Sequence, residues 1–350
     1  MPKTTQYAPV LAKIGAERSK LLSETKVKIL SESKNLTELT TQLRDTSYQE
    51  QIARITPPLN GRKLERAYSE NLIETFLKII QYSPKHAMQF LQLYLLRFEF
   101  EHVKAMIKTT NAKLSAEQKL AKIYFSVEDY FEHHSVIEEA AKASTIAQVI
   151  HAFKGTKYFS PLTLAMKNYE ETASTASFDV LVDKYYYEEL CERYHKLPKK
   201  ERGYAEFYAC METDSFTLLT LLRGKLLNLD PNWLRLISPQ FHFNLSKKKV
   251  EALVSAIDFD ATLKIALETD YGKFFSKGQE PHEMLSNAEK AFRKAVFQHA
   301  EASTITDTFN IGLPLAFMTQ KEVEVRNLVA VTLGVEASMK PEAVRNLLLF

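Results

Sequence analysis

Two Glu-x-x-His motifs contain the residues of this chain that are best spaced for chemistry. Glu99 and His102 form the first motif, and Glu192 and His195 form the second. Residues three apart share one face of a helix, and two such motifs on neighbouring helices supply half of the ligands of a di-iron carboxylate site. A di-iron protein is therefore one hypothesis for this chain.

The remaining candidate ligands occur in pairs that are too small for a metal site. Cys191 and His195 lie one helical turn apart, but two ligands do not complete a zinc site, and we expect a buried thiol beside a surface imidazole. His133-His134 has only Glu132 and Glu138 at ligand spacing, so we expect a solvated helix face. The sequence predicts no catalytic, cofactor-binding or metal-binding residue.

Two basic clusters and two Gly-containing pairs could bind anions. Lys199-Lys200-x-Arg202 and Lys247-Lys248-Lys249 are typical of solvated helix ends, and contact with an acidic partner or anionic lipid head groups is the alternative. Gly155-Thr156 and Gly224-Lys225 lack the rest of a Walker loop, so ATP binding is not expected.

Glycine, charge and cysteine content narrow the class of protein. The chain has 350 residues and 9 glycines, a share of about 2.6% against roughly 7% in average usage, which disfavours folds with many tight turns. With 46 Lys and Arg against 43 Asp and Glu, it lacks the cationic excess of a dedicated nucleic-acid binder. Two cysteines exclude a disulfide framework, and the length indicates two or three domains.

No stretch of the sequence has the length and apolarity of a membrane anchor or leader. Residues 1–7 contain no apolar core of signal-peptide length. The longest apolar runs, 89–96 and 309–320, are shorter than the roughly 18 residues of a spanning helix. We expect a cytosolic chain, or one held at a membrane through other proteins.

Apolar residues at helical spacing predict an all-α fold. Val323, Val325 and Val331 also alternate as in a strand, but the repeats described next favour a helix. Prolines predict breaks at 56–58, 83–84, 198, 230–231 and 238–239. The predicted helices are 7–22, 36–48, 64–108 with its break, 123–143, 146–153, 178–194, 247–256, 261–275, 283–300, 314–333 and 341–349.

A Thr-x-Tyr motif recurs three times, each time near the end of a predicted helix. The tyrosines are Tyr48, Tyr158 and Tyr271, at intervals of 110 and 113 residues. Ten residues before each threonine stands an apolar residue, which is Leu36, Ile146 or Phe259. Regular intervals of this kind indicate repeated structural units.

A second motif follows each Thr-x-Tyr and consists of an acid, two residues, a polar residue and an aliphatic residue. Its acids are Glu99, Asp214 and Glu324, at 51, 56 and 53 residues after the preceding tyrosine. Two motifs in the same order predict a threefold duplication with domains 1–115, 116–230 and 231–350. In place of His102 the other copies have Thr217 and Asn327, which favours a structural role over a metal site. We expect Glu324 and Asn327 to stabilise the packing of the third domain.

Three stretches resemble the C subunit of archaeal-type rotary ATPases, in the family that includes the d subunit of the eukaryotic vacuolar ATPase. Together they cover residues 7–346. The departures are His102, where the family tends to have Asn, and 238–241, which lack an expected glycine. The matching motifs are Tyr7 with Arg18-x-x-Leu21-Leu22 and Leu43-x-x-Thr46-x-Tyr48; Tyr208-x-x-x-Glu212-x-Asp214 with Leu222-Arg223-x-Lys225; and Phe309-Asn310-Ile311, Ala316-Phe317 and Lys321-Glu322-x-Glu324-Val325-x-Asn327-Leu328.

The resemblance implies three similar helical domains arranged with pseudo-threefold symmetry as a funnel. The wide mouth would receive the central shaft of the motor, and the other end would seat on the membrane proteolipid ring. Such a protein is a non-catalytic rotor adapter, which transmits the torque that couples ATP synthesis or hydrolysis to proton or sodium translocation. It would need no cofactor, small-molecule substrate or nucleic acid, and would be peripheral at the cytoplasmic face of the cell membrane. The alternatives are a helical-repeat scaffold for other partners and the di-iron protein.

Overall fold

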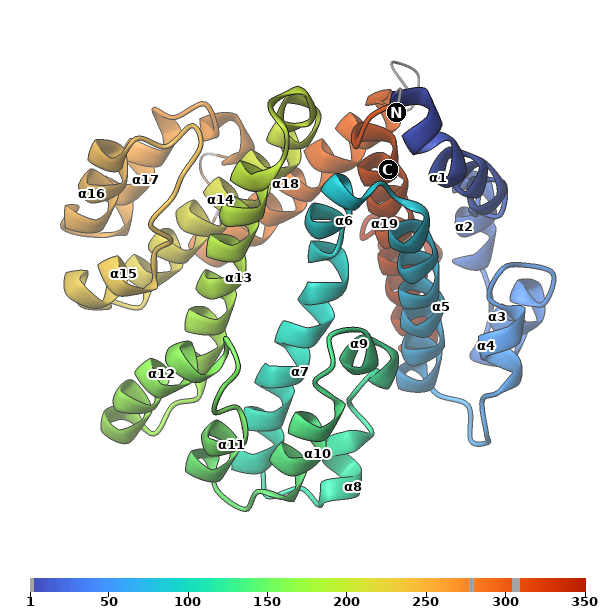
Figure 1. The fold of residues 1–350 in the computed structure, drawn as a ribbon, viewed down its shortest axis with the longest axis horizontal. Coiled ribbons are helices and arrows are strands. Elements are labelled where there is room, and N and C mark those ends of the chain that lie inside the picture. The colour runs from blue at the N-terminus through green and yellow to red at the C-terminus, as the bar shows by residue number, and fades with distance from the viewer. Residues whose placement is uncertain (1–2, 277, 279, 304–308) are drawn as a thin grey trace. The chain divides into compact units, whose positions relative to one another are not determined.

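The chain is helical throughout the part that the computed structural model describes, residues 3–276, 278, 280–303 and 309–350 (Figure 1). Those residues contain no strand, so the all-α prediction is confirmed. Met1 and Pro2, the start of the segment without a predicted signal peptide, lie outside the described residues. Within the described ranges, no helix combines the length and apolarity needed to cross a membrane.

Two compact units divide the fold. Unit 1 comprises the described residues of Met1–Leu91, Leu197–Phe207 and Lys290–Phe350, and unit 2 comprises Gln92–Lys196 and those of Tyr208–Glu289. The three-domain limits 1–115, 116–230 and 231–350 stay a prediction.

Unit 1 combines helices from both ends of the sequence. Its long helix α19 packs along α5, and α1 contacts both (Figure 1). A Cβ on Gly334 of α19 would lie 2.4 Å from a Val344 methyl carbon, so this glycine lets α20 approach closely. The helices are α1 (Lys3–Arg18), α2 (Glu24–Leu30), α3 (Leu36–Leu43), α4 (Gln49–Ala53), α5 (Gly61–Tyr82), α6 (Lys85–Leu91), α19 (Gly312–Glu336) and α20 (Pro341–Arg345), with parts of α14 (Lys199–Leu226) and α18 (Pro281–Ser303).

Unit 2 is built around α7, which packs against the short helices that follow it and against α13 (Figure 1). In the same unit, α12 packs on α13 and α16 packs on α17. The elements are α7 (Leu93–Asn111), α8 (Ala116–Leu120), α9 (Phe125–Tyr130), α10 (His134–Lys142), α11 (Ile146–Ala152), α12 (Phe159–Thr172), α13 (Ala176–Lys196), α15 (Pro231–Ile237), α16 (Lys247–Ser255), α17 (Phe259–Leu267) and the 3₁₀ turn η1 (Gly272–Phe274), with the remainder of α14 and α18.

Three pairs of short helices share one local design: α2–α3, α10–α11 and α16–α17. The second helix of each pair begins at the apolar residue that the repeat placed ten positions before its threonine, namely Leu36, Ile146 or Phe259. Each of these helices has an N-cap side chain that accepts a backbone N–H, supplied by Asn35, Thr145 and Asp258. The repeat seen in the sequence therefore corresponds to a repeated helix start.

Several predicted helix limits are wrong in instructive ways. The helix predicted over 123–143 is divided into α9 and α10, because Glu132 has a φ of 62°, and a left-handed residue ends a helix. The predicted helix 36–48 ends at Leu43, and 261–275 ends at Leu267. The predicted break at Asp230-Pro231 is confirmed, and it separates α14 from α15, which Asp230 caps. Residues 323–331 are helical as predicted.

Candidate functional site

The Thr-x-Tyr motifs are turns that end α3, α11 and α17. The Thr46 hydroxyl donates to the Leu43 carbonyl at 2.6 Å and accepts the Tyr48 N–H at 3.3 Å. This side chain takes an orphan carbonyl at the helix end and fixes the direction in which the tyrosine leaves. The same pair of bonds is made by Thr156 with Phe153 and Tyr158, and by Thr269 with Ala266 and Tyr271.

Each tyrosine is buried, and its hydroxyl donates to one of the three repeated acids. The bonds are Tyr48 to Glu324 at 2.5 Å, Tyr158 to Glu99 at 2.5 Å, and Tyr271 to Asp214 at 2.8 Å. We call these contacts the Glu324, Glu99 and Asp214 anchors. Glu99 and Asp214 each bond the next repeated tyrosine along the chain, whereas Glu324, the last acid, bonds the first tyrosine, Tyr48. The two motifs of the repeat therefore meet in space.

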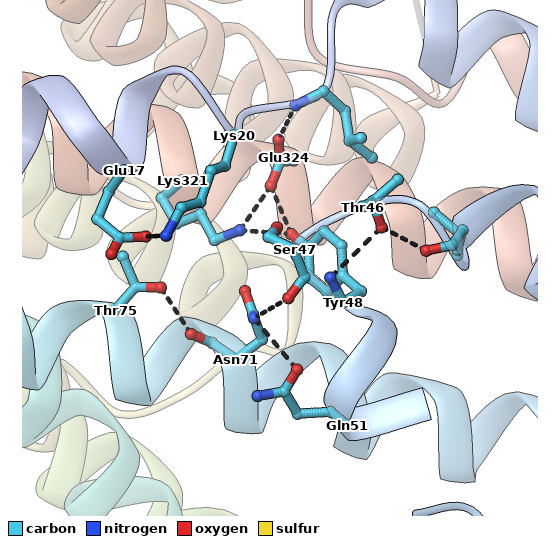
Figure 2. Close-up of polar contacts among 12 residues, drawn as sticks. Glu17, Lys20, Thr46, Ser47, Tyr48, Gln51, Asn71, Thr75, Lys321 and Glu324 are labelled. Carbon is cyan, nitrogen blue, oxygen red and sulfur yellow. Dashed lines mark hydrogen bonds and ion pairs between the residues drawn. The ribbon is translucent and has the colours of Figure 1, made fainter. Parts of the chain in front are cut away.

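The Glu324 anchor holds a buried cation (Figure 2). Lys321 Nζ lies 2.7 Å from Glu324 Oε1 and 2.9 Å from the Tyr48 hydroxyl, and the Leu22 N–H donates to Glu324 Oε2. Burial lowers the pKa of Lys321, with Glu324 opposing the change, and burial together with Glu324 raises the pKa of Tyr48 well above its usual value. Charge-assisted bonds of this kind join α19 to the segment between α1 and α2 and to the turn between α3 and α4.

The Tyr48 turn is also tied to the neighbouring helix α5. Asn71 Nδ2 donates to the Ser47 carbonyl at 2.7 Å, and its own backbone carbonyl accepts the Thr75 hydroxyl at 2.8 Å (Figure 2). Gln51 completes the set by accepting from Asn71 Nδ2 at 3.3 Å. The turn that presents Tyr48 is therefore fixed on two sides.

In the Glu99 anchor, an imidazole takes the place that the backbone N–H of Leu22 has in the Glu324 anchor. His133 Nδ1 donates to Glu99 Oε1, and Lys157 Nζ lies 3.5 Å from Glu99 Oε2. Burial would raise the pKa of Glu99, but His133 and Lys157 outweigh it, so the pKa is lowered. The bond from Glu99 in turn raises the pKa of His133.

The Asp214 anchor uses backbone donors. Asp214 accepts the Phe243 N–H at 3.1 Å and the Asn244 N–H at 2.7 Å. His242 Nδ1 is 4.0 Å from the carboxylate, and burial lowers the pKa of this histidine. Burial and the neighbouring Asp214 raise the pKa of Tyr271.

The polar residue three positions after each acid holds an adjacent segment. Asn327 donates to the Leu349 carbonyl at 3.2 Å and accepts its N–H at 2.9 Å. His102 Nε2 accepts the Tyr124 N–H at 3.1 Å. Thr217 lies 3.4 Å from His242 Nδ1. Asn327 and His102 therefore add a segment that their acid does not bind, whereas Thr217 contacts the same segment, residues 242–244, that Asp214 holds.

The two Glu-x-x-His motifs have different environments. Glu192 pairs with Lys196 on the exposed face of α13, and His195 is exposed. Among the described residues, the group of side chains arranged to hold a metal is Glu99, Glu128 and His133, so Glu192 and His195 do not belong to it. Sequence reasoning missed Glu128, because nothing in the pattern of α9 distinguishes this carboxylate from a surface one.

The histidine pair splits between two environments. The solvated-face prediction is wrong for His133, which is half-buried and bonds Glu99, a residue 34 positions earlier. It is correct for His134, which is exposed and bonds Asp129 at 2.5 Å.

The other predicted candidates lie where the sequence placed them. Cys191 is buried, with Sγ 3.6 Å from the Thr213 hydroxyl, and burial raises the pKa of its thiol to about 11. Lys199 and Lys200 are exposed in the first turn of α14, and Lys247 and Lys248 in that of α16. These positions fit an inert thiol and solvated helix starts.

The three anchors are suited to fixing helices rather than to transforming a substrate. Their acids and tyrosines are at most 6% exposed. Buried carboxylates whose oxygens accept several hydrogen bonds hold packed segments in one arrangement. The chemistry of the anchors is therefore structural.

Comparison with known proteins gives a consistent result over nearly the whole chain. Residues 10–347 match the model of the family described as ATP synthase (C/AC39) subunit. The C subunit of the A-type ATP synthase of Methanocaldococcus jannaschii is 28% identical, over 98% of this chain and 86% of the relative. Those of Thermococcus kodakarensis and Pyrococcus abyssi are each 24% identical, over 98% and 99% of this chain and 90% of each relative.

Proposed function

The chain belongs to the ATP synthase (C/AC39) subunit family, and on that premise we propose that it is the rotor adapter of an A-type ATP synthase or ATPase. It links the subunits of the central shaft to the membrane proteolipid ring. It carries the torque that couples ATP synthesis or hydrolysis to proton or sodium translocation. It performs no chemistry, and this role needs no cofactor.

The observation that carries this proposal is the extent of the family match. The match begins at residue 10 and ends at residue 347 of 350. The three relatives, each the C subunit of an A-type ATP synthase, align over 86% to 90% of their own length. A shared local motif would not align over nearly the full length of this chain and most of the length of each relative.

The anchors support a division of the chain into three similar helical domains. With the limits 1–115, 116–230 and 231–350, each anchor joins the acid of one domain to the tyrosine of the next, and Glu324 with Tyr48 joins the last domain to the first. The family resemblance implies that the three domains form a pseudo-threefold funnel whose wide mouth receives the shaft. Packed helices with bonded buried groups transmit load because such interiors have low compressibility.

The seat on the ring would be polar and matched in shape. A body with threefold symmetry on a ring of another symmetry cannot repeat one contact, so the three domains would present different surfaces on similar cores. The protein would lie on the cytoplasmic face of the cell membrane as a peripheral member of the complex.

A pull-down tests the proposal. The tagged full-length chain is recovered from gently detergent-solubilised membranes of its source, with untagged membranes as the control, and co-purifying proteins are identified by mass spectrometry. We expect shaft subunits and the small proteolipid together. Recovery of the chain alone, from the soluble fraction, would contradict the adapter role.

A further inference from the structure

Two buried carboxylates and an imidazole meet beside α7, and only the Glu99 anchor has this arrangement among the three anchors. Glu99 comes from α7, Glu128 from α9, and His133 from the residue before α10. One ligand atom of each lies within 4.8 Å of the others. Glu99 and Glu128 are at most 1% exposed, whereas His133 keeps 26% of its side chain exposed.

The second oxygen of Glu128 is the feature that points to a ligand. Glu128 Oε1 lies 2.5 Å from His102 Nδ1. Because His102 Nε2 accepts the Tyr124 N–H, the imidazole proton is on Nδ1 and is donated to Glu128. Glu128 Oε2 is buried and has no hydrogen-bond partner. An unsatisfied buried carboxylate oxygen is costly, and a cation in the cluster would satisfy it.

The two carboxylate oxygens of Glu99 also have different partners. Oε2 accepts the Tyr158 hydroxyl at 2.5 Å and lies 3.5 Å from Lys157 Nζ. Oε1 accepts the hydrogen bond from His133 Nδ1. The lysine is therefore next to the oxygen that holds the tyrosine, and the other oxygen is directed toward the cluster.

The other two anchors show that fixing a tyrosine does not need this cluster. At the place of His133, the Glu324 anchor uses the backbone N–H of Leu22, and the Asp214 anchor uses that of Asn244. Neither Glu324 nor Asp214 belongs to a group of three metal-ligating side chains among the residues that the structure describes. The cluster is thus an addition to the shared anchor.

We propose that Glu99, Glu128 and His133 bind a divalent transition-metal ion of the zinc type. The ligands are one imidazole nitrogen and two carboxylate oxygens, a set that suits zinc better than magnesium or calcium. A tetrahedral zinc ion holds its ligand atoms roughly 3.4 Å apart. Zinc would therefore displace the proton that His133 Nδ1 donates to Glu99 Oε1, and these two atoms would separate to make room for the ion. Water reaches the fourth position from the exposed side of His133. His102 is a positioning residue, since it orients Glu128 from behind.

Titration of the metal-free full-length chain with zinc chloride, followed by calorimetry, tests the site. We expect one zinc ion per chain. His133→Gln removes a ligand on a half-exposed side chain and abolishes this binding, whereas His134→Gln, an exposed neighbour, leaves it unchanged. Glu128→Gln also abolishes it. Circular dichroism establishes that each variant is folded.

A second variant separates positioning from ligation. His102→Asn puts at this position the residue type that Asn327 provides in another anchor, and should weaken zinc binding by about 10- to 100-fold without abolishing it. Cobalt in place of zinc should give visible absorption bands that are lost in His133→Gln. The proposal is overturned if the native chain takes up no zinc, or if His133→Gln and Glu128→Gln bind it as tightly as the native chain does.

Discussion

The Glu324 and Asp214 anchors both hold a buried tyrosine in place, but the charge of the acid is compensated differently in the two. Both acids accept a buried tyrosine hydroxyl and backbone N–H groups from the segment before a short helix. Of the two, the Glu324 anchor contains a buried lysine, 2.7 Å from the acid. The tyrosine bond is therefore the constant part of the repeat, and the way in which the carboxylate charge is compensated is free to vary.

The largest expected effect comes from neutralising Glu324. Glu324→Gln should lower the free energy of unfolding by about 3–5 kcal/mol, because it leaves Lys321 buried without a counter-charge. Urea unfolding measures this. Glu322→Gln, two residues away on the same helix and paired with Arg326, is the matched control and should cost at most about 1 kcal/mol. Equal losses for the two variants would show that the buried pair is unimportant.

Removing both charges should restore part of that loss. The double variant Lys321→Met with Glu324→Gln should be more stable than Glu324→Gln alone, because no uncompensated ion remains. A double-mutant cycle by urea unfolding gives the coupling energy, which we expect at about 1–3 kcal/mol. Additive effects would contradict a direct interaction between Lys321 and Glu324.

Substitution of Asp214 should lower the free energy of unfolding by less than substitution of Glu324 does. Asp214→Asn removes charge-assisted bonds to Phe243, Asn244 and Tyr271 but leaves no buried cation, so we expect a loss of about 1.5–3 kcal/mol. The difference between this value and that for Glu324→Gln, measured under the same conditions, tests the comparison. A larger loss at Asp214 would mean that the lysine does not set the size of the effect.

The polar residue three positions after each acid should contribute still less to the free energy of unfolding. Asn327→Ala breaks two bonds to the Leu349 backbone and should cost about 1–2 kcal/mol. Thermal unfolding measures the change. If Asn327→Ala unfolded like the native chain yet failed to assemble with other subunits, Asn327 would be an interface residue and not a packing residue.

The smallest effect concerns pH at the Asp214 anchor. Because burial lowers the pKa of His242 below 6.5, the folded chain binds this proton less well than the unfolded chain. The stability contribution is present above pH 6.5 and is lost as the pH falls through the lowered value. Asp214 opposes the shift, whereas Lys247 adds to it.

Substitution of this histidine isolates the pH effect. His242→Gln should flatten the fall of stability below pH 6.5, by less than about 1.4 kcal/mol per pH unit. Urea unfolding between pH 5 and pH 8 measures it, and His151→Gln at an exposed position is the matched control. Identical pH profiles for native chain and His242→Gln would exclude a role for this imidazole.

The sequence by itself determined the all-helical class, the proline breaks and the starts of α3 and α11, whereas α17 begins two residues before the predicted 261. These features follow from periodicity, N-cap side chains and the threonine turn, and the interactions that make them span only a few residues. The same local information established that Thr46, Thr156 and Thr269 precede equivalent tyrosines. The exact helix ends were less predictable, because a residue such as Glu132 can adopt a left-handed φ without any distinctive pattern around it.

Only the tertiary structure decided which groups meet. Tyr48 and Glu324 are 276 positions apart, and the spacing of the two motifs along the chain does not indicate that each acid bonds the following tyrosine. Glu128 and His133 likewise became part of a cluster only when α9 and α10 packed on α7. Partners of this kind are chosen by the packing of distant helices and by the need to satisfy buried polar groups, and a local sequence pattern contains neither.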